Sequence, residues 1–380
     1  MKKKHIIFSI VTLVLLITFV TGFNYFKTTN TYVEDNIKNQ TKITKGISMN
    51  LEQTAGAGDY KTVTQSSWPT EGYKFNSELS RCENGSEISW DDTKKAVIVS
   101  GNLSDKCYVY FDIYQPTLAE YIKSQYTGTQ GDNALYYHNS TLTNGAGDNS
   151  YRYAGASASV NNYICLGSDA TTCPDANLFR IIGVFGDQTK VIRAKSIGNQ
   201  QWNISSSNTW SSSSLNTYLN GEYLTSLGTL ADKIVTMTWK VGGGTFANIL
   251  SSVPKTAYQY EVGSSASSTT HDAKIGLMYV TDYYYSASPS AWTLVGYNIN
   301  DETKDYRVAK TKNWLYLGSY EWTISRNSDA TTNAFLVYSA GYVDHYIVTY
   351  SFAARPSFNL LSSTAYVSGS GSMSDPVRVN

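Results

Sequence analysis

The chain has 380 residues, of which 41% are hydrophobic and only 16% are charged, and its 30 basic residues balance its 30 acidic ones. This balance provides no basic field, so nucleic acid and anionic lipid are not expected as partners. The length allows two or more domains with separate cores, and their solubility has to come from uncharged polar residues and from 31 tyrosines.

The chain begins with a short basic segment followed by a long uncharged one. Residues 2–4 are all lysine, and an uncharged run of 21 residues extends from Ile6 to Phe26. At about 1.5 Å per residue, a helix of this length spans the roughly 30 Å core of a bilayer, with the lysines on the cytoplasmic side. We therefore expect residues 1–26 to form a cytoplasmic tip and a transmembrane anchor at the cell membrane. The alternative is a cleaved signal peptide ending near Gly22, which would make the protein secreted.

Four cysteines follow this segment and form two local pairs, Cys82 with Cys107 and Cys165 with Cys173. Disulfides are the expected state of cysteines in an oxidising extracellular compartment. In the chain-entropy model these two disulfides would contribute roughly 3.5 and 2.5 kcal/mol. A metal site is the alternative, but the histidines are scattered and no Cys-x-x-Cys pair is present. The sequence therefore predicts two disulfides and no metal.

The first extracellular segments differ in their apolar pattern. Residues 27–59 are polar and lack a sustained apolar period, so we expect a stalk. Residues 60–113 contain short apolar runs separated by turn residues, which predict strands at 73–75, 88–90, 96–99 and 107–111. This spacing is typical of antiparallel hairpins and predicts a small all-β, sandwich-like module. Because the module has few apolar residues for a core, a disulfide would add stability that the core alone does not supply.

Residues 114–150 are expected to contain a short helix and a linker. Pro116 is placed as at a helix start, and apolar residues recur at helical spacing up to Tyr126. Residues 127–149 are rich in Gly, Asn, Ser and Thr, which favours a linker into the next domain.

Residues 151–380 are expected to form one α+β domain. Apolar runs at 179–185 and 190–194 predict two strands joined by a turn. Apolar residues three and four apart predict an amphipathic helix over 211–227, behind a Ser-rich cap. Further strands are expected at 274–281, 335–338, 347–352 and 356–360, before a Ser/Gly tail. The predicted fold class is therefore α+β, with an N-terminal transmembrane helix and a small all-β module.

Several motifs follow one another through this domain. They are Tyr163-Ile164-Cys165 with Cys173-Pro174, Asn177 to Phe185, Trp210 with Leu215 to Asn220, Gly276 to Val280, Glu321 to Ser325, and Ala354-Arg355-Pro356 with Phe358 and Leu360. The series resembles an uncharacterised exported domain of Gram-positive-type bacterial surface proteins. In outline it also resembles the C-type-lectin-like fold of formylglycine-generating enzymes and of variable proteins diversified by retroelements. The resemblance implies a C-type-lectin-like fold for residues 151–380.

The resemblance does not imply an activity. Formylglycine-generating enzymes use a late cysteine pair, and this chain has no cysteine after Cys173. Sugar-binding lectins of this fold use a Glu-Pro-Asn type of calcium loop, which the sequence lacks. Nucleophile elbows on a strand-to-helix turn, phosphate loops and His-rich zinc motifs are also missing. We therefore expect no catalysis, no cofactor and no metal.

The segment from Tyr338 to Ser351 has the composition of a contact surface. Ten of its fourteen residues are Tyr, Ser, Asp, His, Ile or Thr, which are the products of adenine changes in an Asn codon. Retroelement-diversified proteins vary their binding face in this way, although a domain rich in Tyr, Ser and Thr would contain such a run without diversification. Tyr supplies rigid contact area, and Ser, Thr and Asp supply adaptable hydrogen bonds. The candidate ligand-binding residues are Tyr338, Tyr342, Asp344, His345, Tyr346, Thr349 and Tyr350.

Exposure is expected for Tyr342, Asp344, His345 and Tyr346, whereas Tyr350 is equally compatible with the core. If the segment is a strand, alternation places Tyr346 and Tyr350 on one face together with Val348 and Phe352.

A second aromatic cluster combines residues 282–285 with Trp292. Tyr284 and Trp292 are further candidate ligand-binding residues, because such rings can line a groove for a sugar or a peptide. A structural role is the alternative, since Tyr is a good strand former. Separately, Arg355 is expected to anchor a buried network, with Glu321 as its ion-pair partner.

These features together predict a membrane-anchored extracellular binding or adhesion protein that presents a Tyr-rich surface to a protein or glycan ligand. One alternative is a structural envelope protein without a specific ligand. Another is a cell-wall or glycan enzyme with an unrecognised carboxylate pair, which would require clustered and partly buried acids.

Overall fold

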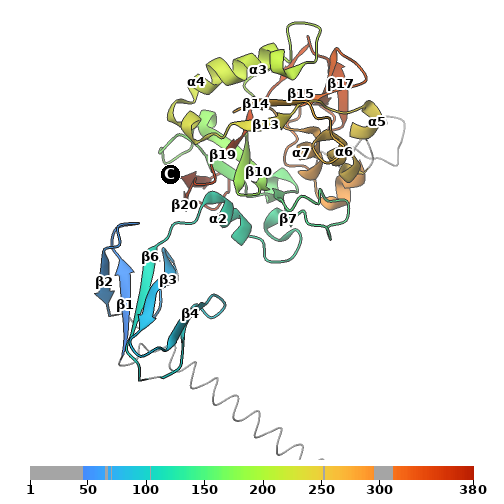
Figure 1. Cartoon of the computed structure of the whole chain (residues 1–380). Helices are drawn as coiled ribbons and strands as arrows, with labels where there is room; N and C mark the ends of the chain where they lie inside the picture. The colour runs from blue at the N-terminus through green and yellow to red at the C-terminus, as the bar shows by residue number, and fades with distance from the viewer. Residues whose placement is uncertain (1–45, 65–66, 70, 103, 251–252, 295–310) are drawn as a thin grey trace, which may run out of the picture. The chain divides into compact units, whose positions relative to one another are not determined.

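The computed structural model describes residues 46–64, 67–69, 71–102, 104–250, 253–294 and 311–380. The chain divides into two compact units, Met1–Gln115 and Pro116–Asn380 (Figure 1). The predicted membrane segment lies outside the described residues. Within the described part, no helix is long and apolar enough to cross a bilayer. The mixed α+β class is confirmed, with strands predominating over short helices.

The first unit consists of a four-stranded sheet and a separate hairpin, coloured blue to cyan in Figure 1. The sheet order is β2 (Tyr60–Val63), β1 (Ile47–Glu52), β6 (Cys107–Ile113) and β3 (Tyr73–Cys82), and the hairpin pairs β4 (Glu87–Asp91) with β5 (Ala96–Ser100). Strand β1 runs parallel to β6, and the other neighbours are antiparallel. The core gathers around Phe111, whose ring contacts Trp68, Phe75 and Trp90.

Strand β1 corrects the predicted stalk over residues 27–59. Ile47, Met49 and Leu51 alternate with polar residues, which is a strand pattern, and Met49 is completely buried. The pattern was missed because it contains only three apolar residues and follows a long polar segment. The described β-module therefore begins at Ile47, not at residue 60.

Both predicted disulfides are confirmed. Cys82 and Cys107 are directly opposite each other in the pairing of β3 with β6, so their bond staples the sheet of the first unit. Cys165 is bonded to Cys173 in the second unit and closes a short loop after β9.

The second unit is built on an eight-stranded sheet. Its main path is β19 (Ser357–Leu360), β11 (Gln188–Arg193), β10 (Leu178–Phe185), β9 (Tyr163–Cys165), β21 (Val377–Val379) and β20 (Tyr366–Ser368). Strand β8 (Tyr151–Tyr153) also pairs with β10 and carries β7 (Leu135–Tyr137) at its other side. The predicted pair 179–185 and 190–194 is thus confirmed as β10 and β11, which lie at the centre of the core.

Two smaller sheets contain the other paired strands among the described residues of this unit. A five-stranded sheet has the order β12 (Asn199–Gln201), β18 (Ser351–Ala353), β15 (Glu321–Arg326), β16 (Asn333–Val337) and β17 (Val343–Ile347). A two-stranded ribbon pairs β13 (Met237–Lys240) with β14 (Thr270–Ala273).

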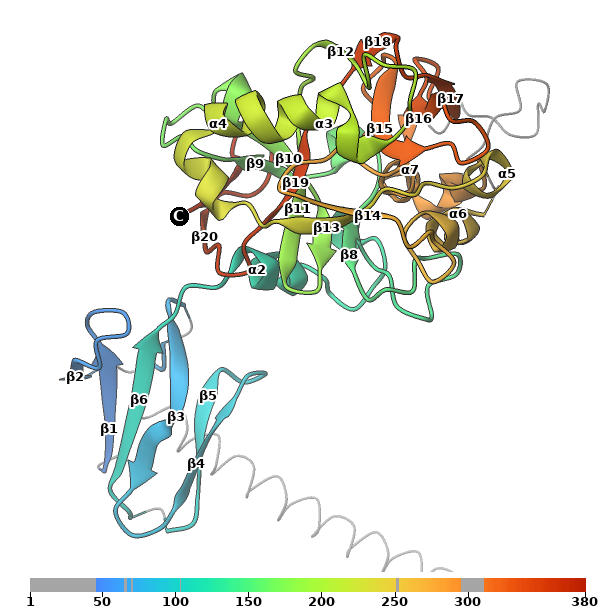
Figure 2. The ribbon, with the colours of Figure 1, turned by 45° about the horizontal axis from the view of Figure 1, so that its top comes forward.

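The helices of the second unit are short. They are α2 (Leu118–Ser124), α3 (Ser214–Tyr218), α4 (Leu224–Ser226), α5 (Phe246–Ile249), α6 (Pro254–Glu261) and α7 (Val280–Tyr285). A π-turn over Leu219–Tyr223 joins α3 to α4, so the predicted helix over 211–227 is confirmed as one helical run capped by Ser213. Figure 2 shows this run, labelled α3 and α4, and its buried Leu215, Leu219 and Tyr223 belong to the core of the unit.

The segment 127–149, predicted as a linker, is part of the second unit. Leu135 and His138 have no exposed surface, and β7 adds to the eight-stranded sheet. The prediction relied on the high content of Gly, Asn and Ser, but these residues form turns between buried positions. The unit accordingly begins at Pro116 instead of residue 151.

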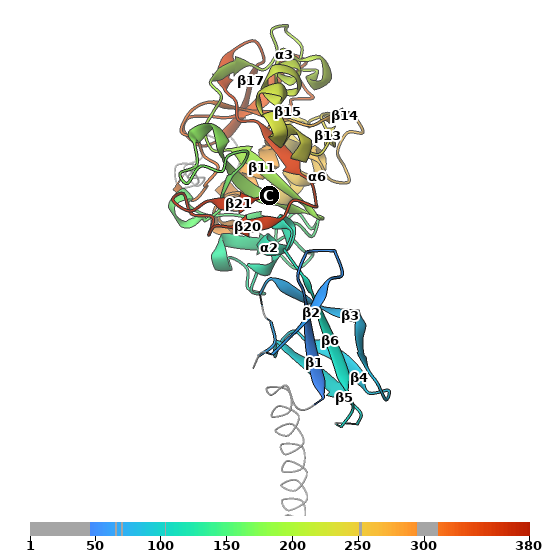
Figure 3. The same ribbon diagram turned by 90° about the vertical axis from the view of Figure 1, so that its left-hand side faces the viewer.

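Three other strand or tail predictions also change. Residues 274–281 are not a strand, because α7 begins at Val280 and only an isolated bridge joins Gly276 to Ser357. The predicted strand 347–352 is interrupted by a turn between β17 and β18. The Ser/Gly tail contains β20 and β21, which lie beside α2 in Figure 3, and Tyr366 stacks on Tyr121 with ring centroids 3.7 Å apart.

The predicted ion pair between Arg355 and Glu321 is confirmed. Arg355 donates from Nε and Nη2 to the two carboxylate oxygens of Glu321, at 2.6 and 2.9 Å. Both side chains are buried, and Arg355 Nη2 also donates to the carbonyl of Leu315. The pair ties the start of β15 to the chain before β19.

Replacing Glu321 with Gln should strongly destabilise the second unit, because it leaves the buried Arg355 guanidinium without a carboxylate. We expect the free energy of unfolding, measured by urea denaturation, to fall by about 3–5 kcal/mol. The matched control is Asp175→Asn, which breaks the ion pair of Asp175 with Lys195, whose side chains are 65% and 60% exposed. That change should cost less than about 1 kcal/mol. Equal losses in the two variants would contradict the assignment.

His138 should make the protein sensitive to mild acid. Burial and the nearby Arg152 hold the pKa of His138 well below its usual 6.5, although Asp148 opposes the shift. Below pH 6.5 the unfolded chain gains a proton that the folded ring does not accept, so stability falls as pH decreases.

Below pH 6.5, the free energy of unfolding of the natural protein, measured by urea denaturation, should fall with a slope that approaches about 1.4 kcal/mol per pH unit. The slope should be smaller in His138→Gln. Asp148 cannot produce the same slope, because its lowered pKa affects stability only below its ordinary value of 3.8. An unchanged slope in the variant would contradict the role of His138.

Candidate functional site

Six aromatic side chains on the strands of the five-stranded sheet and on the turns next to them form a continuous surface that we call the aromatic ridge. They are Tyr320, Tyr338, Tyr342, Tyr346, Tyr350 and Phe352. Ring centroids are 4.6 Å apart for Tyr342 and Tyr338, 4.7 Å for Tyr338 and Tyr320, and 5.2 Å for Tyr320 and Phe352. The series continues from Phe352 to Tyr346 at 5.4 Å and from Tyr346 to Tyr350 at 4.8 Å.

Strand geometry explains why these rings meet. The β16–β17 turn brings Tyr338 and Tyr342 together, since the amide of Tyr338 donates to the carbonyl of Tyr342 at 2.8 Å. The completely buried Trp322 of β15 supports the ridge through its ring contact with Phe352. Tyr350 and Tyr320 are 50% and 37% exposed, whereas the other ridge rings are half-buried. The ridge is therefore a fixed surface with two accessible rings.

The structure brings together four of the seven candidates in the segment 338–351, namely Tyr338, Tyr342, Tyr346 and Tyr350. His345 lies on the opposite face of β17, where its ring contacts Phe246 and Phe335 and its Nδ1 is 2.7 Å from Asn333 Nδ2. The expected joint exposure of residues 344–346 is wrong, because successive strand residues point to opposite faces.

The two remaining candidates of this segment are also half-buried. Burial raises the pKa of Asp344, while the amide of His345 donates to its carboxylate and opposes the shift. Thr349 lies in the turn after β17, where its carbonyl accepts a hydrogen bond from Gln201.

The second predicted cluster is structural. Tyr284 lies on α7 with 1% of its surface exposed, and its hydroxyl donates to the carbonyl of Ile249 at 2.9 Å. Trp292 is 2% exposed, and its indole N–H donates to the carbonyl of Ala287. Neither ring can contact a ligand from solvent, so the predicted groove at these residues is wrong. The tyrosines belong to a helix, and all three of its tyrosine rings face packed neighbours.

A second site lies on the eight-stranded sheet, where one row of residues crosses four strands. Arg152 of β8 is opposite Gly183 of β10, Gly183 is opposite Lys190 of β11, and Lys190 is opposite Asn359 of β19. Residues that are opposite each other in neighbouring strands point to the same face of a sheet. The row therefore places two cations and an amide on one face, with a glycine between the cations.

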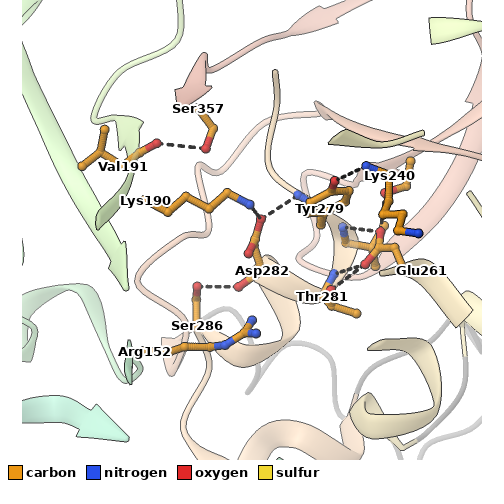
Figure 4. Close-up of polar contacts among 12 residues, drawn as sticks. Arg152, Lys190, Val191, Lys240, Glu261, Tyr279, Thr281, Asp282, Ser286 and Ser357 are labelled. Atoms are coloured by element: carbon orange, nitrogen blue, oxygen red, sulfur yellow. Dashed lines mark hydrogen bonds and ion pairs between the residues drawn. The ribbon is translucent and has the colours of Figure 1, made fainter. Parts of the chain in front are cut away.

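Helix α7 covers this face through a buried ion pair. Lys190 Nζ donates to Asp282 Oδ2 at 2.5 Å, and the same oxygen accepts from the amide of Tyr279 at 2.8 Å (Figure 4). Lys190 and Asp282 are 5% and 3% exposed. Burial lowers the pKa of Lys190, and the Asp282 carboxylate opposes that shift. The Lys190 ammonium also lies 4.6 Å from the ring centre of Tyr279 and 5.4 Å from that of Trp239.

Glu261 of α6 fixes the start of α7. Its carboxylate accepts from the amides of Val280 and Thr281, each at 2.8 Å, and from the hydroxyls of Thr281 and Ser325 (Figure 4). Burial raises the pKa of Glu261, and these hydrogen bonds oppose the shift. With both oxygens bonded, Glu261 acts as a structural cap of the helix.

Arg152 is held by a second buried pair. Its Nε donates to Ser150 Oγ at 2.7 Å, and its Nη2 donates to Asp148 Oδ2 at 2.6 Å. Burial would raise the pKa of Asp148, but the guanidinium and the Ser150 hydrogen bonds outweigh it and lower the pKa. The guanidinium also lies 4.6 Å from the ring centre of Phe185.

Arg152, Lys190 and Asp282 line a cavity of about 170 Å³. Its walls include the rings of Phe185, Trp239, Tyr258 and Tyr279, and its polar lining includes Arg152, Lys190, Lys240, Asp282 and Asn359. Sequence reasoning missed this cavity, although it treated Asp282 as part of an aromatic cluster. The sequence did contain a signal for this cavity, namely charged residues within apolar strand segments. Lys190 stands in an apolar run, and Arg152 stands between two tyrosines.

A comparison of the chain with protein-family models, with curated protein sequences and with solved structures found no significant match. The resemblances of residues 151–380 therefore remain predictions. Across the described residues, no cluster of three or more His, Cys, Asp or Glu side chains is arranged to hold a metal ion.

Proposed function

We propose that this chain is a non-catalytic extracellular binding protein that is held at the membrane by its N-terminal segment and contacts a protein ligand through the aromatic ridge. The two formed disulfides support an oxidising location outside the cytoplasm. The apolar run from Ile6 to Phe26 supports membrane attachment. For the second unit we propose a C-type-lectin-like fold, supported by its motif order and by its mixed sheets and short helices.

The ridge is the observation that carries this proposal. Aromatic residues supply much of the binding energy at protein interfaces, and a preorganised surface loses little conformational entropy on binding. Here the rings are held by one another and by the buried Trp322.

The arrangement of the rings favours a protein over a glycan. A sugar ring stacks on a flat aromatic face, but several ridge faces are covered by their neighbours. Tyr338 and Tyr342 stack with planes 19° apart, and Tyr320 and Phe352 with planes 22° apart. The accessible parts of such pairs are ring edges and hydroxyls, which suit the varied groups of a protein surface.

The test compares ridge tyrosines with an equally exposed tyrosine elsewhere. The full chain in detergent is applied to an array of extracellular proteins and glycans, together with Tyr320→Ala/Tyr350→Ala and with Tyr260→Ala. Tyr260 is 38% exposed and lies on α6, outside the ridge. We expect saturable protein binding that weakens by about 30-fold in the double variant, as for a hot spot of 2 kcal/mol, and is kept in Tyr260→Ala.

The melting temperatures of all three proteins should agree within a few degrees, because each changed ring is at least 37% exposed. Equal binding by the natural protein and the double variant would contradict the proposal. Binding to glycans alone would reassign the ridge to sugars, and the absence of any saturable ligand would favour a structural envelope protein.

A further inference from the structure

We propose that the cavity between the eight-stranded sheet and α7 binds one hydroxylated ring that carries a carboxylate, such as an acidic monosaccharide unit. The cavity is separate from the aromatic ridge and would serve a second, small ligand. Its volume of about 170 Å³ is close to the roughly 150 Å³ of a cavity that binds one benzene ring. A single six-membered ring therefore fits, whereas a peptide or a longer glycan segment does not.

Two buried cations in the cavity have hydrogen-bond donors to spare. Lys190 Nζ makes one hydrogen bond, to Asp282, although an ammonium has three donors. Arg152 uses Nε and Nη2, and its Nη1 makes no hydrogen bond with any described residue. Arg152 and Lys190 are 2% and 5% exposed, and both line the cavity. Aromatic rings lie beside both cations, and no oxygen of the described residues accepts from these remaining donors, so an anion that enters the cavity can accept from them.

The charges of the lining favour an anion. Arg152, Lys190 and Lys240 contribute three positive charges to the wall, and Asp282 contributes one negative charge. Asp148 pairs with Arg152 from behind, and the buried Glu261 carboxylate acts on Lys190 from α6 without lining the cavity. The lining itself therefore presents more basic than acidic side chains, and a ligand with one carboxylate complements it without the excess charge of a phosphate.

The remaining polar groups favour hydroxyls on the ligand. Asp282 accepts only through Oδ2, so its Oδ1 accepts no hydrogen bond from the described residues. The side-chain oxygen of Asn359 is likewise without a donor in the described part of the chain, since Asn359 bonds only through Nδ2. Both side chains line the cavity. Hydroxyl groups of a sugar can donate to these oxygens, while an aromatic acid would leave them unpaired.

The cavity walls and its rim are compatible with a sugar ring. Trp239 and Tyr279 approach each other with centroids 5.8 Å apart and offer aromatic surface to the apolar face of a ring. Thr238 lies between Met237 and Trp239 on β13 and is exposed, so it marks the opening to solvent. A large side chain at Thr238 should block entry without changing any buried group.

The experiment is isothermal titration of the full chain in detergent with sodium glucuronate, with glucose and with benzoate as comparison ligands. We expect saturable binding of glucuronate, and affinities at least about tenfold weaker for glucose and for benzoate. A glucuronate-terminated oligosaccharide distinguishes a free acid from a glycan end. Its binding with equal affinity would assign the cavity to chain ends, and its exclusion would assign it to the free acid.

Three variants locate the site. Thr238→Trp should abolish glucuronate binding, and Lys240→Ala should weaken it by about tenfold. Lys195→Ala, which removes an exposed lysine elsewhere, should leave it unchanged. Because Tyr320→Ala/Tyr350→Ala changes only the ridge, it should also bind glucuronate normally, so the two proposals can fail separately. Absence of glucuronate binding, equal binding of glucose or benzoate, or full binding by Thr238→Trp would overturn the inference.

Discussion

The buried ion pair between Lys190 and Asp282 is the contact on which the second unit depends. It joins β11 to α7, and the same carboxylate caps the helix through the amide of Tyr279. Removing both charges from water is costly, and the cost is offset only because Lys190 also contacts the ring of Tyr279 and Asp282 bonds an amide. The position of the helix is therefore coupled to the position of a sheet residue, and a cavity with ordered charges remains between them.

Helix α7 also connects the cavity to the aromatic ridge. Tyr283 follows Asp282 in this helix, and its hydroxyl donates a hydrogen bond at 2.8 Å to the carbonyl of Gly341. Gly341 lies in the turn that carries Tyr338 and Tyr342. Glu261 fixes the same helix to Ser325 of β15, the strand whose Trp322 supports the ridge. One short helix thus supports both proposed binding surfaces, which differ in chemistry. The ridge offers uncharged rings for a broad contact, and the cavity offers charges for one small ring.

Local patterns were sufficient to predict much of this structure. The β10–β11 hairpin, the capped helical run over 214–226, both disulfides and the pair of Arg355 with Glu321 each follow from short-range spacing or from the chemistry of one residue type. The cavity could not be predicted in this way. Arg152, Lys190, Asn359 and Asp282 are far apart in the sequence, and they meet only because four strands share one register row beneath a helix. Similarly, the exposure of His345 and Tyr350 was decided by strand alternation and by a turn that composition does not encode.

The most direct test of this account is hydrogen–deuterium exchange of the α7 amides in the natural protein and in Lys190→Met, with Lys195→Met as the surface control. If the ion pair positions the helix, the amides of α7 and of the Gly341 turn should exchange at least about tenfold faster in Lys190→Met, through local opening, while those of β10 keep their protection. Unchanged protection of α7 in Lys190→Met would contradict the central role of the Lys190–Asp282 contact.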